Sequence, residues 1–167
     1  MSLSLDLLEQ ARHLLHREPR RPRQASLRRS VSSAYYALFH LLVHDSAASI
    51  AGMRTPALHA LVARAHQHGE LREVCGEFAR GQWPRSLRTL AAAPPDLRLR
   101  QVALVFGELQ DARHQADYNL TYSFRRTEAE RLVRRVEQAF SDWKIIRRTE
   151  EARLFLLALL FNKRWNR

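Results

Sequence analysis

The sequence predicts an all-α protein, folded as an up-and-down bundle of four to five helices. Apolar residues recur at helical spacing along several segments. Glycine is scarce, at 5 of 167 residues, and the 6 prolines cluster near apparent element boundaries. No segment alternates apolar and polar residues for long enough to predict a β-sheet. The length fits a single domain over residues 1–167.

Two helices are expected in the first fifty residues. Leucine and alanine at helical spacing predict a short amphipathic helix from about Leu3 to Arg17, which a basic connector with two prolines then ends. A second helix is expected from about Gln24 to Ser49. Arg28 and Arg29 lie in its first turns, where the helix dipole disfavours cations. An anion, or a carboxylate on another helix, is therefore expected to hold them.

The middle of the chain is expected to form shorter elements. Thr55 followed by Pro56 predicts a helix start, because a hydroxyl can cap the first turn and proline suits the first helical position. This third helix is expected over Pro56–His68, and a short helix over Glu70–Ala79. The segment Gly81–Pro95 is expected to be a loop, because it contains three of the prolines.

Two further helices are expected toward the C-terminus. Asp96 is a cap for a long helix with an apolar stripe, which ends in the segment Arg113–Asn119. Thr127–Glu130 has the pattern of a capping box and opens a helix that runs through Trp143. An additional C-terminal helix is expected within residues 145–167. Its apolar run, Leu154–Phe161, predicts burial against the body of the protein or a second subunit.

The segment Arg113–Asn119 places a guanidinium, an imidazole, a carboxylate, a phenol and amides within two helical turns. Arg113 and Asp117 are four residues apart, so they share a helix face and can pair. Burying such a group of polar side chains is costly unless each is hydrogen-bonded. The segment is therefore either a structural polar network or a site that handles phosphate.

The charge balance favours a polyanionic partner. The formal net charge is +11, and the basic residues are almost all arginines, which bind phosphate bidentately and stack on bases. A codon bias toward arginine explains arginine in place of lysine, but it does not explain the excess of basic over acidic residues. The stretch Arg17–Arg29 is the best candidate for contacting a phosphate backbone; the alternative is a solvated linker.

Several classes of protein and site are disfavoured. A single cysteine, Cys75, excludes an intrachain disulfide framework and a multi-cysteine metal site, and fits a reducing compartment. The charged N-terminus does not resemble a signal peptide, and the longest apolar run falls short of the roughly 20 residues of a membrane span. We therefore expect a cytoplasmic protein without a membrane partner.

His40 and His44 are spaced as a two-histidine face, but no glutamate follows His40, so no metal and no cofactor are expected.

Two segments together resemble the HEPN superfamily of prokaryotic helical domains. The first is Arg28-Arg29-Ser-Val-Ser-Ser-Ala-Tyr35-Tyr36-Ala-Leu-Phe39-His40, and the second is Arg113-His-Gln-Ala-Asp117-Tyr118. Both are similar to a branch of small stand-alone members, and the resemblance spans roughly residues 3–143. It implies a four- to five-helix bundle that forms a homodimer. It also implies RNA cleavage, nucleotide binding, or toxin–antitoxin pairing with a small nucleotidyltransferase.

The nuclease members of that superfamily use an arginine followed, after four to six intervening residues, by a histidine. The resemblance implies that Arg113 steadies a phosphate. Tyr118, Asn119 and Leu120 occupy the positions where the histidine would stand. His114 is then the candidate replacement as a proton shuttle. The alternative is that His114 bonds a neighbouring helix or water.

The other candidate residues also have two interpretations. Tyr35, Tyr36 and Tyr118 either stack a base or are core aromatics whose hydroxyls satisfy the polar network. Asp117 either fixes helix register by pairing with Arg113, Arg28 or Arg29, or orients Arg113 toward a phosphate. Together with His40, these residues form the expected binding or polar network.

The expected function is that of a HEPN-like protein that interacts with RNA or nucleotides. In this interpretation it is a toxin–antitoxin or defence component, with a divergent, metal-independent ribonuclease activity. The alternative is a non-catalytic helical dimerisation or binding module. A nucleotide-binding regulator is a third interpretation.

Overall fold

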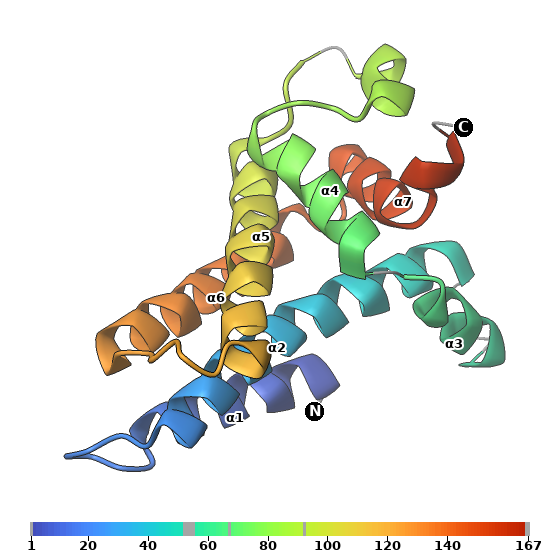
Figure 1. The fold of residues 1–167 in the computed structure, drawn as a ribbon. Helices are drawn as coiled ribbons and strands as arrows, with labels where there is room; N and C mark the ends of the chain where they lie inside the picture. The colour runs from blue at the N-terminus through green and yellow to red at the C-terminus, as the bar shows by residue number, and fades with distance from the viewer. Residues whose placement is uncertain (1, 52–55, 67, 92, 166–167) are drawn as a thin grey trace. The chain divides into compact units, whose positions relative to one another are not determined.

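The computed structural model describes residues 2–51, 56–66, 68–91 and 93–165, and every regular element within these ranges is a helix, with no strand (Figure 1). The all-α prediction is therefore confirmed. The elements are α1 (Leu3–His16), α2 (Gln24–Ala51), α3 (Pro56–Arg64), α4 (His68–Ala79), the 3-10 helix η1 (Arg85–Leu90), α5 (Leu97–Tyr118), α6 (Arg126–Ile146) and α7 (Glu150–Trp165). These described helices outnumber the four to five that the sequence predicted.

The structure confirms some predicted helix ends and corrects others. The Asp96 carboxylate accepts a hydrogen bond from the Arg98 amide at 2.7 Å, as expected of a cap for α5. The capping-box prediction at Thr127 is wrong, because the amides of Glu128 and Ala129 bond to the Arg125 carbonyl and place the start of α6 earlier. The predicted cap at Thr55 lies outside the described residues.

The predicted third helix is too long, and the predicted loop is incomplete. Helix α3 ends at Arg64, where the chain tightens into i→i−3 hydrogen bonds from Ala65 to Val62 and from His66 to Ala63. The segment Gly81–Pro95 contains η1. The C-terminal residues form α7, which is separate from α6 because Thr149 begins a new helix and its hydroxyl accepts a hydrogen bond from the Ala152 amide at 3.2 Å.

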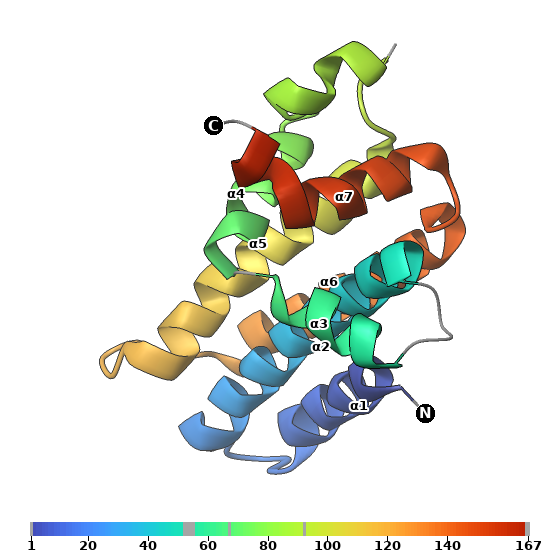
Figure 2. The same cartoon turned by 90° about the vertical axis from the view of Figure 1, so that its right-hand side faces the viewer.

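Unit 1, one of two compact units, comprises residues 1–40 and 105–140. Within it, α1 lies beside the first part of α2 (Figures 1 and 2), and the Ser30 hydroxyl donates to the Ala11 carbonyl at 2.7 Å. The rings of Tyr35 and Phe106 are 5.6 Å apart and join α2 to α5. The buried apolar side chains of this unit include Leu8, Leu15, Leu27, Val31, Leu38, Leu109, Leu132 and Val136.

Unit 2 comprises residues 41–104 and 141–167, and aromatic rings form much of its core. Helices α4 and α7 lie side by side (Figure 2), and the rings of Phe78 and Phe155 join them at 4.9 Å. Trp143 packs against Phe155 at 6.1 Å, and Trp83 against Phe78 at 5.2 Å. Phe155 therefore connects Phe78 to Trp143 within this core, and 0% of its surface is exposed.

The apolar run of α7 is not buried on every side. Phe155, Leu156, Ala158, Leu159 and Leu160 are buried, whereas Leu154, Leu157 and Phe161 keep part of their surface exposed. Among the described helices, none combines the length with the apolar character that crossing a bilayer requires.

Candidate functional site

Arg28 caps the C-terminal end of α5, which lies in the same unit. Its guanidinium donates to the carbonyls of Gln115 (3.3 Å), Ala116 (2.8 Å) and Asn119 (2.8 Å), and also to that of Tyr122. The last carbonyls of a helix have no intrahelical partner and form the negative end of its dipole. The expected holder of Arg28 was an anion or a carboxylate, and this prediction is wrong, because four backbone carbonyls hold the side chain.

The turn after α5 is closed by side-chain amides. The side-chain oxygen Oδ1 of Asn119 accepts hydrogen bonds from the backbone amides of Thr121 (3.0 Å) and Tyr122 (3.2 Å), which is an Asx-type turn. Gln24, at the start of α2, bonds both backbone groups of Phe124, donating to the carbonyl at 2.8 Å and accepting from the amide at 2.9 Å. These bonds fix the position of the end of α5 against the start of α2.

Arg113 is held in a cage of tyrosines. Its guanidinium carbon lies 5.5 Å from the ring centroid of Tyr35, 5.6 Å from that of Tyr36 and 5.5 Å from that of Tyr118. Its Nη2 donates to the Tyr36 hydroxyl at 2.9 Å, and its Nε lies 3.1 Å from the Asp117 carboxylate. Only 16% of the Arg113 side chain is exposed. The predicted pair with Asp117 is confirmed.

The electrostatics of this cage keep Arg113 charged. Partial burial by itself lowers the pKa of Arg113, but the hydrogen bond to Tyr36 and the charges that Tyr36, Tyr118 and Asp117 can carry outweigh it and raise the pKa above its usual value. Asp117 also accepts a long hydrogen bond, 3.4 Å, from the Ser32 hydroxyl on α2. Arg113 and Asp117 therefore join α5 to α2 as well as to each other.

Three other candidate side chains lie at the surface. Tyr118 is 63% exposed, although one of its faces covers Arg113. His114 is exposed, and its ring lies 5.2 Å from that of Tyr118. Arg29 is exposed and has no hydrogen-bond or ion-pair partner among the described residues.

Arg29 and Tyr118 line a surface hollow of about 450 Å³, which we call the Arg29 hollow. Five of the predicted site residues line it, and the sequence missed the three small ones, which leave the space open. The lining residues are Ala25, Arg28, Arg29, Ser32, Tyr36, Ala116, Asp117 and Tyr118. Small residues give no chemical signal in a sequence, so only their place one turn from the predicted residues could have indicated them.

The structure does not bring every candidate residue into the hollow. Tyr35 is fully buried, as expected of a core aromatic. His40 lies one turn along α2, with its ring 6.3 Å from that of Tyr36, and burial lowers its pKa, so its imidazole is mostly neutral at pH 7. Across the described residues, no group of three or more histidine, cysteine, aspartate or glutamate side chains is placed to hold a metal.

The tyrosine cage is expected to stabilise the fold. Replacing Arg113 with glutamine removes the ion pair and the cation between the rings, and is expected to lower the free energy of unfolding by about 2 kcal/mol. Urea denaturation measures this change. His114→Gln, one residue away and exposed, is the matched control and is expected to stay within about 0.5 kcal/mol of the wild type. Equal, small effects of the two variants would contradict a structural role for Arg113.

The site therefore combines the free guanidinium of Arg29, the exposed phenol of Tyr118 and the charged guanidinium of Arg113, which lies among the tyrosine rings. Comparisons with protein-family models, with curated proteins and with solved structures found no match for this chain.

Proposed function

We propose that this protein is a HEPN-like helical module that binds single-stranded RNA at the Arg29 hollow. The observation that carries the proposal is the free guanidinium of Arg29 in one hollow with the exposed ring of Tyr118. Proteins that bind single strands combine a positively charged surface for the backbone with aromatic side chains on which bases stack.

The phosphate-binding part of the proposal rests on arginines of unit 1. Arg20, Arg21 and Arg23, in the connector before α2, are exposed, and their side chains have no partner among the described residues. Arg29 follows on α2. The connector is itself held in place, because the Arg126 guanidinium donates to the carbonyls of Pro19 and Glu18. These arginines supply the sequence-independent attraction for a phosphate backbone.

The base-binding part of the proposal rests on Tyr118. Arg113 supports one face of its ring at 5.5 Å, and His114 lies beside it. A ring held in this way loses little conformational freedom when a base stacks on its free surface, which favours binding.

Binding is proposed in preference to cleavage because Arg113 is already engaged. A guanidinium that steadies a phosphate during cleavage needs free donors pointing at it. Here Nη2 donates to Tyr36 and Nε faces Asp117, only 16% of the side chain is exposed, and Arg113 does not line the Arg29 hollow. In this proposal, Arg113 keeps Tyr118 in position and Arg29 meets the phosphate.

Fluorescence anisotropy with a labelled single-stranded RNA tests the proposal. Arg29→Gln and Tyr118→Ala are each expected to weaken binding about tenfold, because one loses a phosphate contact and the other a stacking platform. Arg29→Gln is also expected to flatten the dependence of affinity on salt concentration. Arg98→Gln, an exposed arginine at the start of α5, is the charge-matched control and should bind almost as the wild type does.

Two results would overturn the proposal. Equal losses in Arg29→Gln and Arg98→Gln would show that net charge alone attracts RNA. RNA cleavage in EDTA that is abolished by both Arg113→Ala and His114→Ala would replace binding by catalysis.

The homodimer and the nucleotidyltransferase-type antitoxin partner belong to the same proposal, because the resemblance implies both. The alternative, a non-catalytic dimerisation module, is favoured by one observation: Leu120, two residues after Tyr118, is an apolar side chain that is 92% exposed. A wild-type protein that binds no RNA, and whose dimer dissociates in Leu120→Asp by light scattering, would support this alternative.

A further inference from the structure

A second hollow, of about 520 Å³, lies within unit 2, and we call it the Arg153 hollow. Its charged side chains are three arginines and one aspartate. The lining residues are Asp45, Ala48, Ser49, Arg147, Arg148, Arg153, Leu156 and Leu157. None of them belongs to the Arg29 hollow, so the two sites can be tested separately.

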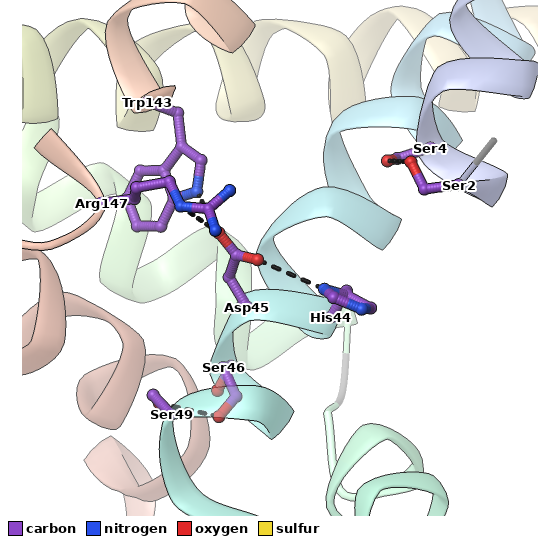
Figure 3. A network of polar contacts seen from close by, with 8 residues as sticks. All are labelled: Ser2, Ser4, His44, Asp45, Ser46, Ser49, Trp143 and Arg147. Atoms are coloured by element: carbon purple, nitrogen blue, oxygen red, sulfur yellow. Dashed lines mark hydrogen bonds and ion pairs between the residues drawn. The ribbon is translucent and has the colours of Figure 1, made fainter. Parts of the chain in front are cut away.

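Asp45 organises one side of this hollow (Figure 3). Only 11% of its side chain is exposed, and one oxygen accepts from the Trp143 indole at 2.8 Å. The same oxygen lies 3.8 Å from Nε of Arg147, and the other lies 3.2 Å from the His44 imidazole. Since Trp143 is itself buried, the carboxylate is fixed and holds Arg147 at the rim.

The charge in this hollow is unbalanced. Asp45 is the one carboxylate among the lining residues, and its pairing with Arg147 leaves two guanidinium groups without a counter-charge. Arg148 and Arg153 are exposed, and their side chains have no partner among the described residues. Like charges gathered around a concave surface raise the local concentration of anions.

We propose that the Arg153 hollow binds small molecules that carry a phosphate group. Arg148 and Arg153 supply donors for the phosphate oxygens, since guanidinium groups pair with phosphate through two parallel hydrogen bonds. Leu156, Leu157 and Ala48 supply an apolar surface for the rest of the ligand. The volume falls within the range of small-molecule sites, roughly 300–1,000 Å³, so a mononucleotide fits the size and the chemistry.

Isothermal titration calorimetry at constant ionic strength tests this proposal with three probes: inorganic phosphate, adenosine 5′-monophosphate and adenosine. The two phosphate-bearing probes are expected to bind, and adenosine is not. The double variant Arg148→Gln/Arg153→Gln is expected to weaken binding of the monophosphate at least about tenfold. Both side chains are exposed, so the variant should fold, and circular dichroism checks this.

A charge-matched control separates a site from a general attraction. Arg85→Gln/Arg98→Gln removes two exposed arginines of unit 2 that do not line the hollow, and it should bind the monophosphate as the wild type does. Equal losses in both double variants, tight binding of adenosine, or no binding of either phosphate probe would overturn the proposal. The proposal would also be overturned if Arg148→Gln/Arg153→Gln weakened the binding of single-stranded RNA but not that of the monophosphate. The hollow would then bind the phosphates of a nucleic-acid backbone and not a small molecule. The variant Arg148→Gln/Arg153→Gln is also compared with its parent in the Arg29→Gln background, where the same loss of monophosphate affinity is expected, so this test does not depend on the RNA proposal.

Discussion

Replacing Phe155 with alanine is expected to lower the free energy of unfolding by about 4 kcal/mol. Its ring touches Phe78 on α4 and Trp143 on α6, and it is fully buried. Truncation removes the burial of the ring and leaves a cavity between aromatic side chains that have little room to close it. Urea denaturation followed by tryptophan fluorescence measures the loss, because Trp143 and Trp83 report on this core.

Leu154 is the matched control for Phe155, because Leu154 is the preceding residue on α7 and part of its side chain is exposed. Leu154→Ala is expected to cost less than about half as much as Phe155→Ala. Equal losses would show that the burial of the Phe155 ring does not determine the stability of unit 2.

Replacing Arg28 with alanine is expected to lower the free energy of unfolding by about 3 kcal/mol. The change removes the donors for four carbonyls around the end of α5, and hydrogen bonds to a charged group contribute more than neutral ones. Urea denaturation followed by far-ultraviolet circular dichroism measures the loss. Hydrogen exchange should also speed up at the amides of residues 119–124, whose turn is no longer anchored.

Two variants control for the Arg28 result. Arg29→Ala removes an exposed arginine at the next position and is expected to stay within about 0.5 kcal/mol of the wild type. Arg28→Lys keeps the charge but cannot reach several carbonyls with one compact ammonium, so an intermediate loss is expected. If Arg28→Ala and Arg29→Ala behave alike, the cap does not stabilise the fold.

Local sequence patterns predicted the local contacts. The spacing of Arg113 and Asp117 predicted their ion pair, because residues four apart meet on a helix whatever the rest of the fold does. The cap at Asp96 was predicted for the same reason. The helical class followed from periodicity along the chain. The count of helices did not, because the prolines of Gly81–Pro95 predicted a loop where the 3-10 helix η1 forms.

Contacts between distant segments could not be predicted. Nothing near Arg28 in the sequence indicates that its partners are carbonyls of residues 115–122, because backbone groups look the same at every position. The three tyrosines around Arg113 were also indistinguishable by type. Tyr35 is buried, Tyr36 accepts a hydrogen bond, and Tyr118 is 63% exposed. These differences arise from where each lies on its helix relative to the neighbouring one.

The bonds of Arg28 also determine when the Arg29 hollow can exist during synthesis. They span 87 to 94 residues of sequence, so α2 is made long before the carbonyls that it caps. Until then the arginine stands beside the positive end of its own helix dipole. Contacts of such wide separation form late and slow the folding of a chain. A nascent or truncated chain that stops before residue 115 therefore has α2 and its arginines but lacks the stacking ring, which makes the hollow a property of the nearly finished polypeptide.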